Sequence, residues 1–179
     1  MLEVISEIKL LGVVLSDDLS WHKNTQFICE KARLKLWILR RMINLNLHHD
    51  QLFDIYCKEI RSILEFGVPV WHPGLTIKDS GTIERIQKVA FKIILKEKFI
   101  DYKNACIYFN TTSLKQRRDK LCLNFATKNL KSETSFFEKN EKKINTRSGE
   151  DKVKHFRCRT NRYEKSSLPY MARLLNINK

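Results

Sequence analysis

The chain has 179 residues, enough for one ordinary domain with its own hydrophobic core, and its few glycines (5) and prolines (3) argue against an all-β fold built on many tight turns. Lys and Arg number 34 against 20 Asp and Glu, so the formal charge of +14 favours polyanions as partners. The five cysteines lie far apart without a CxxC pair, and there is no signal segment, which argues against a secreted protein. No apolar run approaches the ~18 residues that a membrane span needs. We therefore expect an intracellular protein, cytoplasmic or nuclear, with reduced thiols.

The N-terminal segment contains a short apolar run, "IKLLGVVL", from Ile8 to Leu15, which predicts one strand that ends in the turn "SDD". The following "LSW" either starts a return strand or leads directly into a helix. Asp17 and Asp18 are an adjacent carboxylate pair of the kind that holds metal ions in nucleotidyl-transfer enzymes. Adjacent aspartates also favour turns, because they bond their own backbone, and we predict a turn rather than a metal site.

Helical periodicity dominates most of the stretch 23–130. Apolar residues recur every three or four positions over long segments, which is typical of amphipathic helices. Gly67, Pro69 and Pro73 interrupt this pattern and predict an apolar elbow around Trp71. The predicted helices span approximately 23–44, 50–65, 80–96, 102–109 and 113–130, with Asp50 as N-cap of the second and Asp79 or Ser80 as N-cap of the third.

The third predicted helix carries a stripe of cations. At about 100° per residue, Arg85, Lys88, Lys92 and Lys96 fall on a narrow stripe nearly opposite the apolar face. Cations along one helix face can follow successive phosphates and gain from counterion release, whereas the alternative is an ordinary solvated face. Such contacts would position a nucleic acid without reading its sequence.

Two further basic clusters lie toward the C-terminus. Arg117, Arg118 and Lys120 occupy the first half of the fifth predicted helix. From residue 131 onward periodicity is lost and charged residues dominate, which predicts a flexible basic tail. The tail ends in an apolar segment, "SLPYMARLLN", that either docks onto the helical body or waits for a partner. Cations in the middle of the tail alternate with aromatic rings that could stack on unpaired bases. The alternative is a solubilising arm. The residues concerned are Lys152, Lys154, Phe156, Arg157, Arg159, Arg162 and Tyr163.

Other reactive and aromatic side chains have simpler interpretations. His155 and Cys158 form an HxxC pair, but no second pair at ligand spacing accompanies it, so we expect no zinc site. Trp37 and Trp71 lie among apolar residues, which favours core packing over a stacking platform. The remaining cysteines lie on apolar or helical segments and are predicted to pack as small hydrophobes: Cys29, Cys57, Cys106 and Cys122.

Five phrases, in this order, resemble one family of enzymes. "IKLLGVVLSDDLSW", "RSILEFGVPVWHPGL", "DSGTIERIQKVAFKIIL", "LKQRRDKLCLNFA" and "SSLPYMARLLN" look like the region that follows the polymerase palm in reverse transcriptases of non-LTR, LINE-like (jockey-type) retrotransposons. The resemblance covers nearly the whole chain. It implies a β-hairpin near the primer grip, then a helical thumb and C-terminal connection, and hence contact with a template-primer.

The resemblance sets the expected architecture: a mainly α fold with a short N-terminal β-hairpin over 1–22, a bundle-like helical thumb domain over 23–130 and a flexible basic tail over 131–179. Reverse transcriptases of this kind hold two metal ions on a Phe/Tyr-x-Asp-Asp hairpin and a further aspartate upstream. Only twelve residues precede Val13. We therefore expect the chain to lack those aspartates and to have no catalytic activity by itself. We also expect it to hold no cofactor, because the two Mg²⁺ ions of the parent RNA-directed DNA polymerase bind at a site that is absent here.

The expected function is sequence-independent binding of RNA, DNA or an RNA/DNA hybrid by a fragment of such a reverse transcriptase. A rival expectation is that a palm-bearing polypeptide complements the chain in trans for polymerase activity, with the apolar run from Ile8 to Leu15 as the contact surface. Two alternatives remain, a helical protein-interaction module and an inert remnant of a transposable element. The residues expected to bind nucleic acid are Arg85, Lys88, Lys92, Lys96, Arg117, Arg118, Arg157, Arg159 and Arg162.

Overall fold

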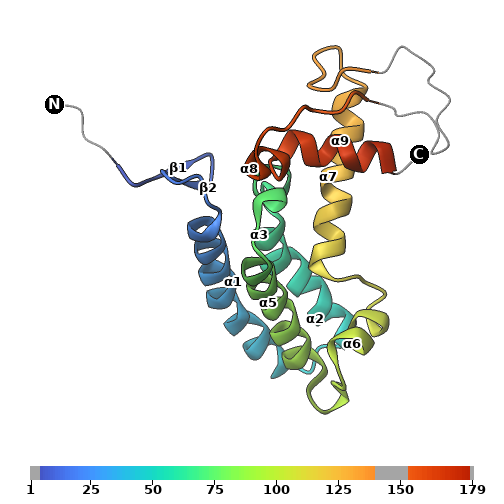
Figure 1. The fold of residues 1–179 in the computed structure, drawn as a ribbon. Helices are drawn as coiled ribbons and strands as arrows, with labels where there is room; N and C mark the ends of the chain where they lie inside the picture. Colours follow the sequence, from blue (N-terminus) through green and yellow to red (C-terminus); the bar gives the residue numbers. More distant parts are fainter. Residues whose placement is uncertain (1–4, 140–152, 178–179) are drawn as a thin grey trace. The chain divides into compact units, whose positions relative to one another are not determined.

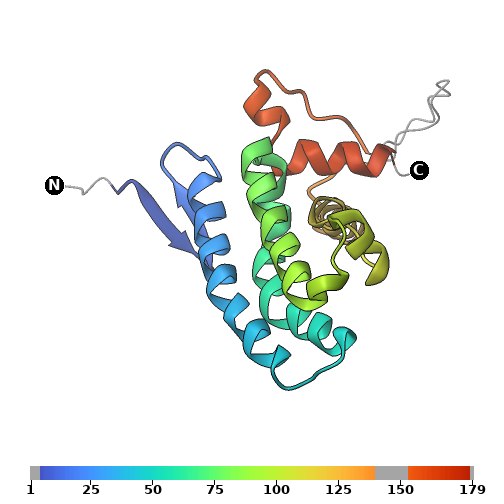
Figure 2. The same cartoon turned by 90° about the horizontal axis from the view of Figure 1, so that it is seen from below.

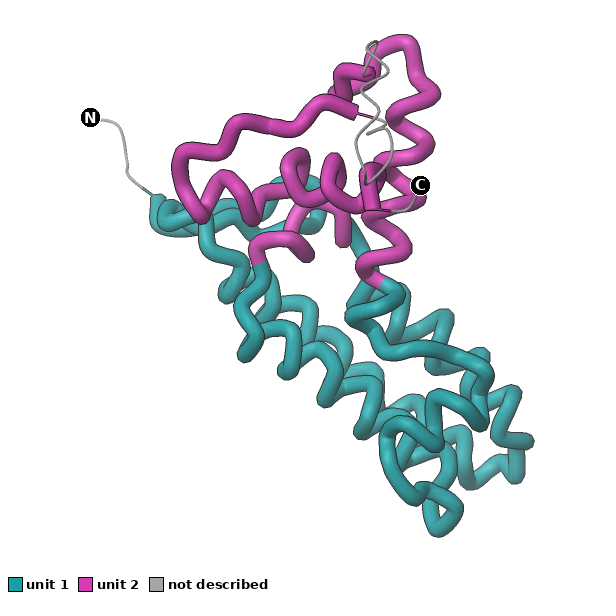
Figure 3. Tube along the Cα trace, turned by 45° about the vertical axis from the view of Figure 1, so that its right-hand side comes forward, with its two compact units in different colours: residues 1–67, 75–117 teal, residues 68–74, 118–179 magenta. Residues whose placement is uncertain are grey.

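The computed structural model of the chain describes residues 5–139 and 153–177. Over these residues the fold is mainly α-helical with one two-stranded antiparallel hairpin near the N-terminus, which confirms the predicted mainly α class (Figure 1). Two compact units divide the chain: unit 1 comprises 1–67 and 75–117, and unit 2 comprises 68–74 and 118–179 (Figure 3). None of the helices in the described ranges has the length and apolar content to cross a membrane.

The N-terminal hairpin consists of β1 (Glu7–Leu10) and β2 (Val13–Ser16), with Ile8 opposite Leu15. Leu11 and Gly12 connect the strands with φ angles of 46° and 88°, and two consecutive positive φ values are typical of a type I′ turn. The prediction of a single strand from Ile8 to Leu15 was therefore wrong, because the chain reverses inside this apolar run. The following "LSW" leads directly into a helix.

Asp17 and Asp18 form the turn that their sequence predicts. Asp18 Oδ1 accepts hydrogen bonds from the Ser16 hydroxyl at 2.5 Å and from the Ser20 amide at 2.8 Å. Asp17 Oδ1 accepts one from the Asp18 amide at 2.8 Å. Both carboxylates thus bond their immediate surroundings, as aspartates in turns commonly do.

Unit 1 is a set of helices around one apolar core. It contains α1 (His22–Ile43), α2 (His49–Tyr56), the π-helix η1 (Cys57–Arg61), α3 (Ser62–Glu65), α5 (Ile77–Leu95), the 3-10 helix η3 (Lys96–Lys98), α6 (Tyr102–Tyr108) and the start of α7 (Leu114–Leu130). α1 packs beside α5, and α2, η1 and α3 form a continuous rod that also packs against α1 (Figure 2). The side chains buried in this unit include Ala32, Leu36, Leu39, Tyr56, Ile60, Leu64, Ile83, Ala90, Phe91 and Ile94.

The N-cap of α2 is His48, so the prediction of Asp50 as N-cap was wrong. The side-chain oxygen of Gln51 accepts a hydrogen bond from the His48 amide at 2.9 Å, which satisfies a backbone donor at the start of the helix. Asp50 lies in the first turn instead, where a negative charge complements the helix dipole.

The N-cap of α5 is Thr76 rather than Asp79 or Ser80. The Thr76 hydroxyl accepts a hydrogen bond from the Asp79 amide at 3.1 Å and donates one to Asp79 Oδ2 at 2.6 Å. The other oxygen of Asp79 lies 2.8 Å from His22 Nδ1, at the start of α1. Burial alone would raise the pKa of Asp79, but the hydrogen bonds from Thr76 and His22 hold it below its usual value. A charged carboxylate therefore joins the N-termini of α1 and α5.

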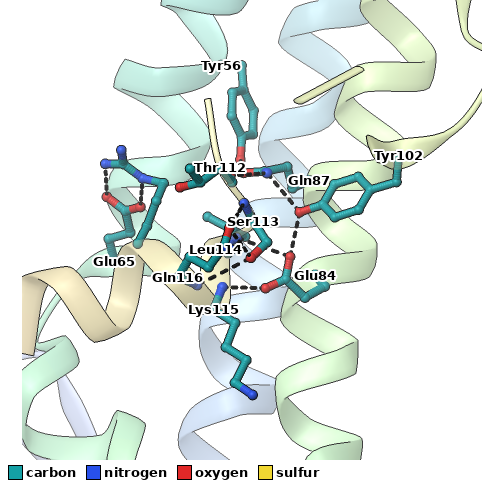
Figure 4. Close-up of polar contacts among 11 residues, drawn as sticks. Tyr56, Glu65, Glu84, Gln87, Tyr102, Thr112, Ser113, Leu114, Lys115 and Gln116 are labelled. Atoms are coloured by element: carbon teal, nitrogen blue, oxygen red, sulfur yellow. Dashed lines mark hydrogen bonds and ion pairs between the residues drawn. The ribbon is translucent and has the colours of Figure 1, made fainter. Parts of the chain in front are cut away.

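A polar network around Glu84 fixes the start of α7 (Figure 4). The Glu84 carboxylate, on α5, accepts hydrogen bonds from the Leu114 amide at 3.1 Å and the Lys115 amide at 2.5 Å. Amides in the first turn of a helix have no intrahelical partner, and a negative charge there complements the helix dipole. Glu84 thus caps a helix that begins 30 residues further along the chain.

Gln87, almost one turn further along α5, is fully buried and extends this network (Figure 4). Its Oε1 accepts a hydrogen bond from the Tyr56 hydroxyl at 2.7 Å, and its Nε2 donates to the Tyr102 hydroxyl at 2.8 Å and to Thr112 O at 3.2 Å. Tyr102 in turn donates to Glu84 at 2.5 Å. Burial, and then the Glu84 carboxylate, raise the pKa of Tyr102, so its hydroxyl stays protonated and donates.

Unit 2 contains α4 (Val68–Trp71), the 3-10 helix η2 (His72–Gly74), the rest of α7, α8 (Asn161–Glu164) and α9 (Ser167–Ile177). α9 packs against α4 and η2, and the Ser167 hydroxyl donates a hydrogen bond to Val70 O at 2.7 Å. Trp71 is fully buried, which confirms its predicted packing role. Of the two alternatives for the apolar end segment, the structure shows docking within this unit.

The predicted tail is described at 131–139 and 153–177. Val153 is buried and pairs with Lys139 in an isolated antiparallel bridge. Its N–H and C=O both bond the Asn176 side chain of α9, each at 3.1 Å. Residues 140–152, Lys152 among them, lie outside the described residues, and the flexibility of the tail stays a prediction.

Replacing Glu84 by Ala should lower the free energy of unfolding by about 2–3 kcal/mol, because two α7 amides and Tyr102 lose a charged acceptor. Urea denaturation followed by circular dichroism measures this loss. The exposed Glu97 of η3 provides a matched control, and Glu97→Ala should change stability by less than about 0.5 kcal/mol. Equal losses in the two variants would show that Glu84 contributes little as a cap.

Asp79→Asn should destabilise the protein in a pH-dependent manner. The folded pKa of Asp79 is lowered, so its charge stabilises the fold above the unfolded pKa of about 4, and this contribution is lost as the pH falls through the folded pKa. The stability difference between wild type and Asp79→Asn, measured by denaturation at several pH values, should be full near neutrality and shrink in acid. Asp54→Asn, at an exposed site, is the control. A difference that does not change with pH would contradict the assignment.

Candidate nucleic-acid interface

The outward face of α5 carries a line of exposed cations. Its inward face is formed by buried side chains at helical spacing, among them Ile83, Ala90 and Ile94. Lys78 was absent from the predicted stripe because the helix was expected to start after it, yet its angle at about 100° per residue places it on this side. The exposed cations, which we call the α5 ridge, are Lys78, Arg85, Lys88 and Lys92.

Both carboxylates of α5 are engaged inside unit 1. Asp79 bonds Thr76 and His22, and Glu84 bonds the start of α7. The other charged side chains of this helix are all positive. The α5 ridge therefore has no acid from its own helix to neutralise it, and from Lys78 to Lys92 it extends about 21 Å at 1.5 Å per residue.

Lys96 is exposed but does not belong to the α5 ridge. At this residue φ is 48° and ψ is −118°, so the chain leaves the helix. The prediction that Lys96 continues the helical stripe was therefore wrong, because α5 ends at Leu95. The last cation of the ridge is Lys92, whose Nζ lies 5.5 Å from the centroid of the Phe99 ring.

The outward half of α1 forms a second basic surface, which we call the α1 face. Trp37 is 50% exposed there, so the prediction that it packs in the core was wrong. The buried side of α1 contains Ala32, Leu36 and Leu39, and the helical period turns Trp37 away from them. Sequence analysis missed this surface because it assigned Trp37 to the core. Its exposed charged residues are Lys23, Glu30, Lys31, Arg33, Arg40 and Arg41.

Aromatic rings on the α1 face are paired with cations. The Arg41 guanidinium lies over the Trp37 ring, 5.7 Å from its centroid. Nearer the N-terminus, Lys9 Nζ and Lys31 Nζ lie over the Phe27 ring, 4.7 and 4.9 Å from its centroid. Such contacts hold flexible cationic side chains in defined positions.

An open hollow of about 370 Å³ lies beside Phe27, between the hairpin, α1 and α3. This volume is at the lower end of the range of small-molecule pockets, about 300–1,000 Å³. Its lining is mostly apolar, and its charged lining residues are both lysines. The lining residues are Lys9, Gly12, Phe27, Ile28, Lys31, Ser62, Ile63 and Phe66.

Arg117 is paired within unit 1. Its Nε donates a hydrogen bond to Glu65 Oε1 at 2.5 Å, and its second guanidinium nitrogen donates to Oε2 at 3.0 Å. A bidentate pair of this kind neutralises the guanidinium. Arg117 therefore adds little net positive charge to an interface.

Arg118 is fully buried in unit 2, and its Nε donates to His72 Nδ1 at 3.1 Å. Since Nδ1 accepts, His72 Nε2 carries the proton that bonds Asp119 Oδ1 at 2.7 Å, and the same oxygen accepts from the Tyr170 hydroxyl at 2.5 Å. These bonds connect α7, η2 and α9. Assigning Arg118 to a phosphate-binding surface was wrong, because its side chain is enclosed in this network.

The other predicted cations lie in unit 2. Arg157, Arg159 and Arg162 are exposed, whereas Lys154 pairs with Glu138 at 2.8 Å. The interleaved rings differ, since Phe156 is partly buried near Phe137 and Tyr163 is 42% exposed. The structure thus assigns the candidate cations to separate places: the α5 ridge in unit 1 and the three arginines in unit 2.

The structure shows no metal-binding cluster in its described parts, where no group of three or more His, Cys, Asp or Glu side chains could hold an ion. Cys29 and Cys122 are buried, as predicted for small hydrophobes. Burial, and then Asp119, raise the pKa of Cys122 to about 12, so its thiol stays protonated. The Cys158 thiol donates to Phe156 O at 3.4 Å.

No protein-family model matches this chain, and neither a curated protein nor a solved structure matches it.

Arg118→Ala should lower the free energy of unfolding by about 3 kcal/mol, because it leaves a cavity and removes the donor that bonds His72 Nδ1. Chemical denaturation measures this change. Lys120→Ala, two residues away on α7 and exposed, is the matched control and should cost less than about 0.5 kcal/mol. If Arg118→Ala were as stable as the control, the buried network would not be a structural one.

Proposed function

We propose that this chain binds RNA or DNA without sequence preference, with the α5 ridge as its main contact. The outward face of α5, with its exposed cations and no carboxylate of its own, carries this proposal. A phosphate backbone fits such a line of charge, because each cation that neutralises a phosphate releases condensed counterions. The net charge of +14 favours the approach of any polyanion at longer range.

The ridge is suited to phosphates rather than to base edges. Lysine and arginine contacts to phosphates set position and orientation but carry no sequence information. Gly81 lies on the same outward side of α5, and open space surrounds the position where a Cβ would be. A nucleic-acid backbone can therefore approach the helix closely at this point.

We also propose that the chain acts as the thumb-like part of a non-LTR retrotransposon reverse transcriptase, where it would contribute template-primer binding rather than catalysis. The order of the five sequence phrases supports this, as does a helical fold that follows an N-terminal hairpin. Ile8 and Leu10 of β1 are 51% and 56% exposed, which supports a palm-bearing polypeptide as a protein partner of the hairpin.

The proposal is tested by fluorescence anisotropy with a labelled RNA/DNA hybrid over a salt series. The test variant replaces Lys78, Arg85, Lys88 and Lys92 together by Gln. If the ridge contacts phosphates, the slope of log affinity against log salt should fall by about 3–4. The affinity at about 50 mM salt should fall at least tenfold.

A control variant removes the same amount of charge elsewhere by replacing four exposed lysines by Gln: Lys115, Lys120, Lys128 and Lys131. Its salt slope should stay close to that of the wild type. Equal effects of the two variants would show that only net charge matters. No binding by the wild type even at low salt would exclude the proposed function.

A further inference from the structure

Two aromatic rings with attached cations lie on the outward half of α1, ten residues apart. Lys9 and Lys31 lie over the Phe27 ring, and Arg41 lies over the Trp37 ring. At 1.5 Å and about 100° per residue, the two rings are about 15 Å apart along the helix and about 80° apart around it. A ligand that follows the α1 face therefore reaches both rings.

Each ring borders a hollow or open solvent. Phe27 lines the hollow of about 370 Å³, whose other lining includes Phe66 and Ile63. The Trp37 side is open to solvent, since this residue is 50% exposed and its neighbour one turn back, Leu34, is 71% exposed. Both positions thus combine an accessible apolar surface with a positive charge.

Lys9 and Lys31 bring two positive charges to one side of the hollow. Their Nζ atoms lie 4.7 and 4.9 Å from the same centroid, so the two atoms are within 9.6 Å of each other. Both residues line the hollow, and the other lining side chains are uncharged. A ligand there should present an apolar, flat group to Phe27 and an anionic group to the lysines.

Nucleotides with unpaired bases have this chemistry. A base offers a π face for stacking on an aromatic ring, and its phosphate offers a negative charge to the adjacent cation. In a duplex the base faces are covered by stacking within the helix, and an acidic polypeptide offers charge without a π face. At the 3.4 Å rise per nucleotide of a stacked strand, the separation of the two rings along the helix axis corresponds to about four nucleotides.

We propose that the α1 face is a binding site for single-stranded nucleic acid, in which one unpaired base stacks at Phe27 and another at Trp37. Lys9 and Lys31 bind the phosphate next to the first base, and Arg41 binds near the second. This inference rests on the proposed function, since it assumes a nucleic-acid ligand, and it assigns single strands to α1 while the α5 ridge binds phosphate backbones of any form.

The test compares the full chain and its variants by anisotropy, with a labelled single strand of about 12 nucleotides and a duplex of the same length. Trp37→Leu should weaken single-strand binding about 5- to 10-fold and leave duplex binding within about twofold. Trp37→Phe keeps an aromatic face, so its affinity should stay within about twofold of the wild type. Lys9→Gln with Lys31→Gln should also weaken the single strand more than the duplex.

Phe136→Leu is the matched control, because Phe136 is 60% exposed but lies in unit 2, away from α1 in the sequence. It should leave both affinities unchanged. Thermal melts of all variants exclude unfolding as the cause of a loss, and intrinsic fluorescence quenched by the single strand in the wild type but not in Trp37→Phe gives a second readout.

Three results would overturn the inference: unchanged single-strand binding by Trp37→Leu, an equal loss for single strand and duplex, or binding of polyglutamate with the same dependence on Trp37. The last result would indicate an acidic protein partner. The proposed function fails separately, if the α5 ridge variant keeps its duplex affinity and salt slope. If the wild type binds neither nucleic acid, both proposals fall.

Discussion

The carboxylate of Glu84 is the interaction on which the arrangement of unit 1 depends most. It holds the first turn of α7 through two backbone amides and the hydroxyl of Tyr102, which Gln87 also bonds. These bonds are charge-assisted or at least partly buried. A buried donor or acceptor that lost its partner would destabilise the fold by its full desolvation free energy. The bonds specify where α7 begins relative to α5, which apolar packing alone would leave adjustable.

The same constraint determines the charge of the outer surface. α5 has two carboxylates and uses both inward, one for α7 and one for the start of α1. Had either pointed outward, it would lie next to Arg85 or Lys78 and neutralise part of the ridge. Internal capping thus separates the charges of one helix, with acids facing its neighbours and bases facing solvent. The basic surface is in this sense a consequence of how the helices are capped.

The sequence predicted the helices well, because their apolar residues follow a 3.6-residue period with few interruptions. The sequence failed to predict an N-cap where neighbouring residues are nearly equivalent, and it failed to predict burial where residues distant in the chain determine it. Thr76 and Asp79 are both good N-caps, and in the structure the Asp79 carboxylate bonds Thr76 and the distant His22 instead of capping the helix. In the sequence Arg118 looks like a surface cation, because its hydrogen-bond partner His72 is far away in the chain. Trp37 was predicted to lie in the core because its neighbours in the sequence are apolar, although its angle on the helix places it on the exposed side.

The two basic surfaces of unit 1 differ in how their cations are held, and this difference bears on what each can recognise. On the α5 ridge Lys92 also lies near a ring, that of Phe99, but the ridge as a whole would contact phosphates through charge, a contribution that falls with salt. On the α1 face, Lys9, Lys31 and Arg41 all lie over aromatic rings, so a ligand there meets aromatic surface together with positive charge. Stacking on those rings is also insensitive to screening. Under the two proposals, the chain would hold duplex regions through charge and single-stranded regions through charge and stacking together.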